Sequence, residues 1–100
     1  MKLQVHSIHF DADQKLIAFI QKKVDKLETF YDRIIDGEVF LRLEKNGVKE
    51  NKISEVKINI PGQQLFAKAQ SNSFEASTDE AVEGIRRQLK KHKEKLYSSQ

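Results

Sequence analysis

The chain has 100 residues, with 18 Lys and Arg against 15 Asp and Glu, a net charge of +3 and no cysteine. This length predicts one domain over residues 1–100, which buries too little surface to enclose a deep, water-free active site, so a binding protein is favoured over an enzyme. The absence of cysteine excludes disulfides, thiolate zinc sites and thiol nucleophiles. The N-terminus alternates polar and apolar residues and no apolar run reaches about 18 residues, which predicts a soluble, cytoplasmic protein with no signal peptide and no membrane contact.

The first two predicted elements are a strand over residues 2–8 and a helix over residues 12–29. The strand is expected because apolar and polar residues alternate. At the start of the helix, Asp11 with Gln14 three residues later resembles a capping box, and Asp13 adds negative charge to the first turn. The apolar residues at helical spacing, which form the predicted buried stripe, are Leu16, Ile17, Ile20, Val24 and Leu27.

The second predicted strand follows Asp36-Gly37, which is expected to break the chain. Its inward residues, at alternate positions, are Val39, Leu41 and Leu43. The polar segment 45–52, which contains Asn46-Gly47, then predicts a hairpin loop longer than two residues.

Two more strands are predicted, joined by a tight turn. Pro61 and Gly62 suit a type II turn, because proline presets its φ and glycine tolerates the positive φ that follows. The inward residues are Val56, Ile58 and Ile60 before the turn and Leu65, Ala67 and Ala69 after it. The small alanines leave room for a helix to pack closely above the last strand.

A last helix is predicted from about Phe74 to Leu96, with its start near Asn72 or Ser73. The residues on the apolar side, which is centred on Ile85, are Phe74, Ala81, Val82, Leu89, His92 and Leu96. The basic residues on the remaining surface are Arg86, Arg87, Lys90, Lys91 and Lys93. Gly84 inside this helix is expected to mark close packing, since glycine costs a helix about 1 kcal/mol relative to alanine.

The excess positive charge is concentrated at the end of the chain. Residues 84–100 hold 6 basic side chains and 1 acidic one, whereas residues 1–83 hold 12 basic and 14 acidic ones. This segregation favours a polyanion-binding face of a docked amphipathic helix over a frayed basic tail. The lysines of the first helix that lie mostly off its buried stripe are Lys15, Lys22, Lys23 and Lys26. Nearby acids, among them Asp25, Glu28 and Asp32, are expected to weaken their local charge.

Together these elements predict an α+β fold with the order β-α-β-β-β-α. A right-handed crossover makes the first two strands parallel and hairpins make the others antiparallel, which gives a four-stranded mixed sheet. Each strand has one apolar face, so two helices are expected on one face of the sheet, as in a double-stranded-RNA-binding domain. This shape favours RNA as the polyanion, contacted through its phosphates and not through its base sequence.

No catalytic, metal or cofactor site is predicted. His6 and His9 are three residues apart on a strand, which places them on opposite faces, where they cannot share an ion. Helix capping explains Asp11 and Asp13, and neither a nucleophile elbow nor a glycine-rich phosphate loop occurs, so no small-molecule substrate is expected. His92 is expected at an edge of the core or hydrogen-bonded to a strand terminus.

A set of motifs runs through the chain: Ile60-Pro61-Gly62 with Leu65 and Ala67, Phe74 with Ala76, and Arg87-Gln88-Leu89-Lys90-Lys91-His92-Lys93-Glu94-Lys95. This pattern resembles the ribosome hibernation-promoting factors, a family also called ribosome-associated inhibitor or sigma-54 modulation proteins. One departure lies at residues 74–78, which read Phe-Glu-Ala-Ser-Thr where many relatives have an aromatic-Ala-Ala-Ile-Asp signature. The acid and the large aliphatic residue of that signature are replaced here.

The resemblance implies the same β-α-β-β-β-α fold and binding to the small ribosomal subunit near the decoding centre. Occupying the channel of messenger and transfer RNA would block translation by exclusion, without reaction chemistry. The matching positions that would contact ribosomal RNA phosphates are Lys22, Lys23, Lys26, Arg87, Lys90, Lys91 and Lys93, to which the charge pattern adds Arg86. Long family members add a C-terminal dimerising domain, so this chain resembles the short form and is expected to be a monomer off the ribosome.

A second hypothesis is a protein-interaction module whose open sheet face docks a partner such as a transcription factor. Phe40 and Phe66 are expected to face outward there, where aromatic rings can stack on bases, although isolated exposed aromatics are common. Added salt separates the two hypotheses, because phosphate binding by several cations weakens steeply with salt and an apolar sheet interface does not.

Overall fold

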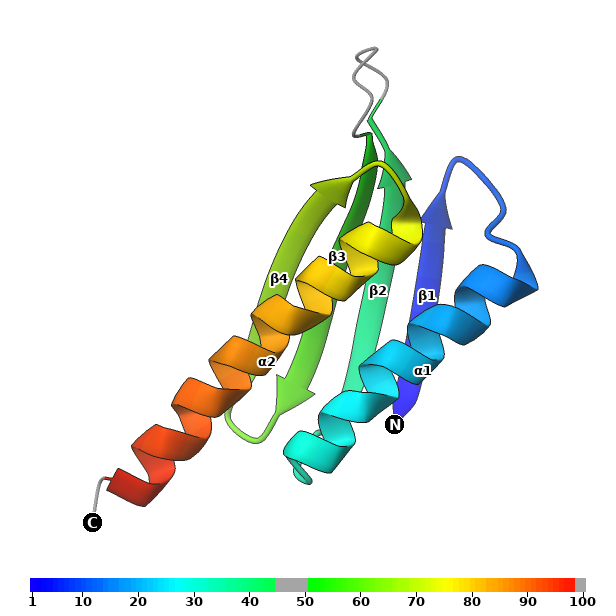
Figure 1. Ribbon diagram of the computed structural model, residues 1–100. Helices are drawn as coiled ribbons and strands as arrows, with labels where there is room; N and C mark the ends of the chain where they lie inside the picture. Colours follow the sequence, from blue (N-terminus) through cyan, green and yellow to red (C-terminus); the bar gives the residue numbers. More distant parts are fainter. Residues whose placement is uncertain (45–50, 99–100) are drawn as a thin grey trace.

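The computed structural model describes residues 1–44 and 51–98, and its elements follow the predicted order. They are β1 (Lys2–Ile8), α1 (Gln14–Phe30), β2 (Asp36–Leu43), β3 (Lys52–Ile60), β4 (Gln63–Ser71) and α2 (Phe74–Ser98). The strands lie in the order β1-β2-β3-β4, with β1 parallel to β2 and the other neighbours antiparallel. Both helices cover one face of the sheet and leave the other face open (Figure 1). The predicted α+β fold with a mixed sheet is therefore confirmed.

The core lies between the sheet and the two helices. Its buried side chains include Ile20, Val24 and Leu27 of α1, Val39 and Leu41 of β2, Val56 and Ile58 of β3, and Ile85 and Leu89 of α2. They recur at alternate positions in the strands and at helical spacing in the helices, as the sequence pattern predicted. Burial of this apolar surface holds both helices on the sheet. Within the described ranges, no helix has the length and apolar character needed to span a membrane.

The start of α1 and its exposed side differ from the prediction. The N-cap is Asp13 and not Asp11, because the Asp13 carboxylate accepts a hydrogen bond at 2.8 Å from the backbone N–H of Leu16. The helix therefore begins at Gln14. Ile17, predicted to be buried, is 40% exposed. The first turns of α1 lie beside β1, which is one of the two edge strands of the described sheet (Figure 1).

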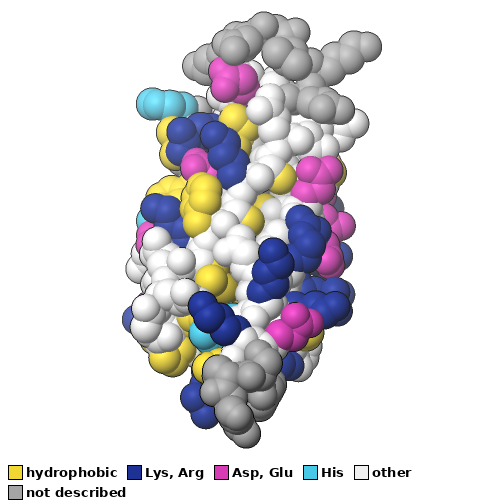
Figure 2. Space-filling model, turned by 90° about the vertical axis from the view of Figure 1, so that its left-hand side faces the viewer, with side chains coloured by type: hydrophobic (Ala, Val, Ile, Leu, Met, Phe, Trp, Pro, Cys, Tyr) yellow, Lys and Arg dark blue, Asp and Glu magenta, His cyan; other side chains and the backbone are white. Residues whose placement is uncertain are grey.

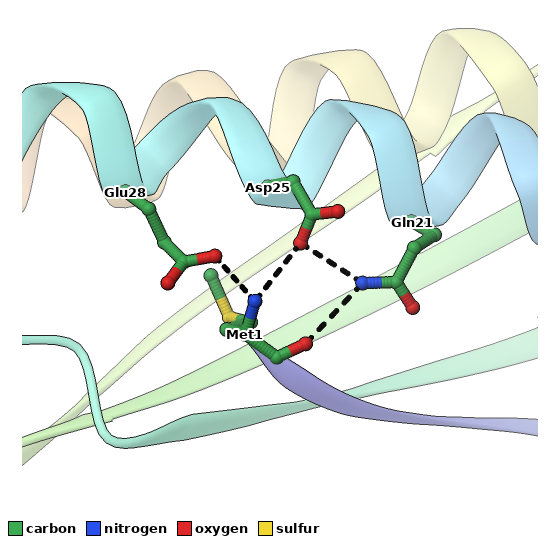
Figure 3. Close-up of polar contacts among 4 residues, drawn as sticks. All are labelled: Met1, Gln21, Asp25 and Glu28. Carbon is green, nitrogen blue, oxygen red and sulfur yellow. Dashed lines mark hydrogen bonds and ion pairs between the residues drawn. The ribbon is translucent and has the colours of Figure 1, made fainter.

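The Met1 amino group forms polar contacts with side chains of α1 (Figure 3). Its ammonium forms ion pairs with Asp25, at 3.3 Å, and with Glu28. The Gln21 amide donates hydrogen bonds to the Asp25 carboxylate at 2.9 Å and to the Met1 carbonyl at 3.4 Å. The hydrogen bond to Glu28 outweighs desolvation and, together with Asp25, raises the pKa of the amino group above its ordinary value of 8.0. In the described residues, Asp25 and Glu28 form their ion pairs with this ammonium and none with a lysine of α1.

The predicted break at Asp36-Gly37 is wrong, because both residues belong to β2. A Cβ atom on Gly37 would lie 2.9 Å from Ile58 Cδ1 and 3.2 Å from Leu3 Cδ1. Glycine at this position therefore makes room for two neighbouring side chains and does not form a turn.

The predicted hairpin loop with Asn46-Gly47 falls mainly on residues 45–50, which lie outside the described residues. Lys52, assigned to that loop by its polarity, is the first residue of β3. Two leucines predicted to be buried are exposed, Leu43 at the last residue of β2 and Leu96, which is 47% exposed. Leu96 lies near the end of α2, where the helix runs past the sheet (Figure 1).

α2 packs closely on β4, as predicted. It begins after Ser73, whose hydroxyl accepts a hydrogen bond at 3.1 Å from the Ala76 N–H. The turn before β4 places Gly62 at a φ of 85°, as a type II turn requires. A Cβ atom on Gly84 would lie only 3.0 Å from the Ala67 Cβ, so glycine permits this close approach of helix and strand.

Three buried hydroxyl groups join the first turns of α2 to β3. The Ser54 hydroxyl lies 2.8 Å from that of Ser77 and 3.0 Å from that of Thr78, and all three residues are fully buried. The Ser77 hydroxyl also donates to the Phe74 carbonyl at 3.2 Å. These contacts explain the departure at residues 74–78, because the two hydroxyl residues face a serine across the core and not an apolar side chain.

Candidate nucleic-acid interface

The predicted basic residues lie on the outer surfaces of α1 and α2. The exposed ones are Lys22, Lys26, Arg86, Arg87, Lys90 and Lys91, and the half-buried ones are Lys23 and Lys93. Figure 2, seen from the β4 side, shows Lys and Arg side chains gathered in the lower half of the molecule with a few Asp and Glu between them. Their contacts divide these cations into two groups, one between the helices and one away from α1.

The first group lines a groove of about 400 Å³ between α1 and α2, which we call the inter-helix groove. Its charged lining residues are Lys23, Lys26, Asp79, Glu83 and Arg86. The Lys23 ammonium pairs with the Asp79 carboxylate at 3.0 Å, and Arg86 lies 3.8 Å from the Glu83 carboxylate. The acids of α2 therefore offset much of the positive charge in this groove.

Phe30, the last residue of α1, engages two of the predicted cations. The Lys93 ammonium donates a hydrogen bond to the Phe30 carbonyl at 2.9 Å and lies 4.5 Å from the centre of its ring. The Arg86 guanidinium lies 5.1 Å from the same ring centre. A cation at the C-terminus of a helix satisfies a carbonyl that has no partner in the helix. Lys93 thus holds the end of α1 against α2, a role that its place in the basic face did not predict.

The second group, Arg87, Lys90 and Lys91, is called here the outer basic surface. In the part of the chain that the structure describes, these residues have no ion pair, and neither do Lys22 and Lys26 of α1. Arg87 and Lys91 are four residues apart and so are neighbours on the helix surface, where like charges repel. An unneutralised cluster of this kind is stabilised by a bound polyanion, which supplies the missing negative charge.

Lys68 of β4 is a basic residue that the sequence analysis did not include in the interface. It lines a second groove together with Arg87 and Lys91 of α2. Since Leu65, Ala67 and Ala69 of β4 were predicted to face inward, alternation places Lys68 away from the core. Its proximity to α2 depends on the helix crossing the last strand of the sheet, which no local pattern encodes.

The open sheet face carries the two predicted aromatic residues. Phe40 is not free, because His6 stacks on its ring with centres 4.7 Å apart and the Lys57 ammonium lies 5.1 Å from its centre. His6 also lies 3.0 Å from the Glu38 carboxylate, whereas Phe66 is 44% exposed. Further polar pairs across this face are Arg42 with Glu55 and Asn59 with Asp36. The face is therefore largely a network of paired polar groups and not a continuous apolar interface.

The histidines lie in separate surroundings. His6 is on β1, while His9 follows the strand with a φ of 66°. Among the described residues, no group of three His, Cys, Asp or Glu side chains is placed to hold a metal ion. His92 is hydrogen-bonded at 3.2 Å to Gln63, the first residue of β4, and meets the Tyr31 ring edge-on. Its predicted contact with a strand terminus is confirmed.

Comparison with known protein families gives one match over nearly the whole chain. Residues 3–97 match the family described as sigma 54 modulation protein / S30EA ribosomal protein. A protein of Pseudomonas putida named ribosome hibernation promoting factor is 31% identical over 98 residues, which cover 98% of this chain and 92% of that protein. A protein of the same name from Escherichia coli K12 is 30% identical over 96 residues, or 96% and 97% of the two chains.

Two solved structures have the same fold. A ribosomal subunit interface protein from Coxiella burnetii superposes with a TM-score of 0.83 at 22% identity, covering 93% of this chain and 98% of that one. The N-terminal domain of Thermus thermophilus Protein Y superposes with a TM-score of 0.80 at 18% identity, covering 92% and 99%. At these identities the two structures support the architecture of the chain and nothing more specific.

Proposed function

Since the chain belongs to the sigma 54 modulation protein / S30EA ribosomal protein family, whose curated relatives are named for ribosome hibernation, we propose that it is a cytoplasmic, ribosome-associated hibernation factor. The proposed binding site is on the small ribosomal subunit near the decoding centre, where the bound protein occupies the path of messenger and transfer RNA. Translation stops because that path is blocked, and no bond is made or broken.

The unpaired outer basic surface carries this proposal. Ribosomal RNA presents closely spaced phosphates, and Arg87, Lys90 and Lys91 offer it cations that form no ion pair among the described residues. Lys22 and Lys26 of α1 are exposed and likewise form no ion pair among the described residues. Three of the predicted cations are expected to contribute less to RNA affinity, because groups of the protein already engage them. Lys23 pairs with Asp79, Arg86 lies near Glu83, and Lys93 donates to the Phe30 carbonyl.

Co-sedimentation with purified small subunits, large subunits and whole ribosomes tests the proposal. The chain is expected to migrate with small subunits and whole ribosomes, and binding is expected to weaken steeply as salt rises. Arg87→Glu with Lys91→Glu is expected to abolish binding and leave the fold intact, as checked by circular dichroism. The matched control is Lys2→Glu with Lys15→Glu, which reverses two exposed charges away from α2.

Three results would count against the proposal: no binding at low salt, binding to large subunits alone, or equal loss in the two double variants. Binding that resists salt would instead favour the second hypothesis, in which a partner protein docks on the open sheet face around Phe66. Charge reversal at Arg87 and Lys91 would then leave the interaction unchanged.

A further inference from the structure

β4 is an edge strand. The strand order ends with it, so no strand in the described ranges pairs with its outer side. An edge strand exposes backbone N–H and C=O groups that another chain can pair with. Residues 63–71 contain no proline and one charged residue, Lys68, so they lack most of the devices that block an edge.

The outer edge of β4 borders a groove of about 380 Å³ formed with α2, which we call the edge groove. Gly84 lines it at the point where α2 approaches Ala67 of β4 most closely, since a Cβ atom there would lie 3.0 Å from the Ala67 Cβ. Arg87, Gln88 and Lys91 of α2 line the same groove together with Lys68 of β4. The groove therefore combines strand backbone with basic and amide side chains.

A side chain already occupies one position of this edge. The Gln88 amide donates a hydrogen bond to the Phe66 carbonyl at 2.7 Å. This is the bond that the N–H of an added strand would make, so the carbonyl is accessible from the groove. Because backbone groups alternate along an antiparallel strand, those of Lys68 face the same side as those of Phe66. The outer edge of β4 is therefore covered at this position by the Gln88 side chain, which can move aside, and not by another strand of the described sheet.

The charge of the edge groove sets the chemistry of its occupant. Lys68, Arg87 and Lys91 line the groove, and among the described residues none of them forms an ion pair. Glu80 is the one acid among the lining residues. The groove thus favours a ligand that carries several negative charges along an extended backbone.

We propose that the edge groove accepts an extended acidic segment of a partner protein, which adds to the sheet as a fifth strand beside β4. The backbone of the segment pairs with β4 after the Gln88 side chain has moved aside. Its carboxylates then face Lys68, Arg87 and Lys91. Main-chain pairing supplies affinity in this mode of recognition, and the side chains supply selectivity.

Two other occupants fit the groove less well. RNA phosphates accept hydrogen bonds but donate none, so the groups of RNA that would meet the basic side chains cannot also pair with the edge carbonyls. A second copy of β4 has no acidic residue between Gln63 and Ser71, and pairing two copies would bring Arg87 and Lys91 of both close together. The inference does not depend on ribosome binding.

The test uses the full chain and a short synthetic peptide with blocked ends, in which Glu alternates with Val. Titration followed by two-dimensional NMR is expected to shift the backbone amides of β4. Methylating the peptide nitrogens that face β4 is expected to abolish binding, because the donors to the edge carbonyls are lost. Arg87→Gln with Lys91→Gln is expected to weaken binding about tenfold or more. The control Lys22→Gln with Lys26→Gln removes equal charge from α1 and is expected to change affinity less than about twofold.

Gln88→Ala removes the covering amide and is expected to leave peptide affinity equal or raise it. Failure of the peptide to bind, binding that survives N-methylation, or equal weakening in the two double variants would overturn the proposal. If polyuridylate shifts the β4 amides and the peptide does not, the groove belongs to RNA and the proposal is equally overturned. Because none of these readouts uses ribosomes, their failure is distinct from failure of the proposed function.

Discussion

The two sides of α2 both carry cations, but only one side has them neutralised. Towards α1, Lys23 and Arg86 face Asp79 and Glu83 in the inter-helix groove. On the outer basic surface and in the edge groove, Arg87 and Lys91 form no ion pair among the described residues, although Glu80 lines the same groove. Contact geometry therefore separates the cations that are engaged within the fold from those that form no ion pair, which composition cannot do.

The largest expected effect is on affinity for small ribosomal subunits, when the cations on each side of α2 are replaced by neutral residues in separate variants. Arg87→Gln with Lys91→Gln is expected to lower affinity for small subunits about 100-fold, since each charged contact contributes roughly 1.5 kcal/mol. Lys23→Gln with Arg86→Gln should lower it less than about fivefold, because exposed pairs that are already neutralised contribute little. Fluorescence anisotropy with labelled protein measures both affinities. Equal losses would break the distinction between the two sides.

The next effect concerns the close approach of α2 to β4, which brings Lys68 beside Arg87. In the variant Gly84→Val, the new Cβ atom would lie 3.0 Å from the Ala67 Cβ, and its two methyl groups would crowd the strand further. The variant is therefore expected to lower the free energy of unfolding by about 2 kcal/mol. Urea denaturation measures this loss. Ala67→Gly in the same chain should restore part of it, and simple additivity of the two substitutions would show that Gly84 and Ala67 do not interact.

A smaller loss of stability is expected when the hydroxyl cluster of Ser54, Ser77 and Thr78, which joins the first turns of α2 to β3, is disrupted. Ser54→Ala leaves the Ser77 and Thr78 hydroxyls facing an apolar methyl group, at an expected cost of about 1 kcal/mol. Thermal unfolding measures the change. Because Ser54 is fully buried and is not part of the outer basic surface, ribosome affinity should remain unaltered while stability falls, and a parallel loss of affinity would contradict this separation.

The smallest effect is expected at Met1, whose ion pairs keep Asp25 and Glu28 engaged. Its amino pKa is raised in the folded chain, so its contribution to stability is complete below about pH 8 and is lost as pH rises through the folded pKa. Urea midpoints measured across this range should show that loss. The N-acetylated chain, which has no titrating amine, is the control and should lack that part of the pH dependence.

Acetylation of the Met1 amino group is also expected to change the local charge around the lysines of α1. It frees Asp25 and Glu28, which then lie on the same helix as Lys22 and Lys26 and are able to offset their charge. Ribosome affinity of the acetylated chain should fall slightly, by less than about twofold. An increase would show that these acids do not reach the basic residues of α1.

Much of the fold was predictable from local patterns. Alternation identified the strands and their inward residues, such as Val39 and Val56, because side chains of a strand point to opposite faces. Helical spacing identified Ile85 and Leu89, and Pro61-Gly62 identified the turn. The errors occurred where neighbours in space overrode the local signal.

Those errors have a common physical cause. Asp36-Gly37 looks like a turn, but Gly37 is needed because Leu3 and Ile58 occupy the space of its side chain. Ile17 and Leu96 have core spacing, but both are exposed, one in the first turn of α1 and the other near the end of α2. Each outcome depends on a residue far away in the sequence.

The same division applies to the candidate interface. The order of the elements, the faces of the strands and the concentration of positive charge on α2 could all be predicted from the chain, because periodicity and charge are properties of consecutive residues. The engagement of Lys23 by Asp79 and of Lys93 by Phe30 could not, and neither could the position of Arg87 and Lys91 beside Lys68 without an ion pair. Pairing is a matter of distances of a few ångströms between distant parts of the chain, and the packing of the helices on the sheet sets those distances.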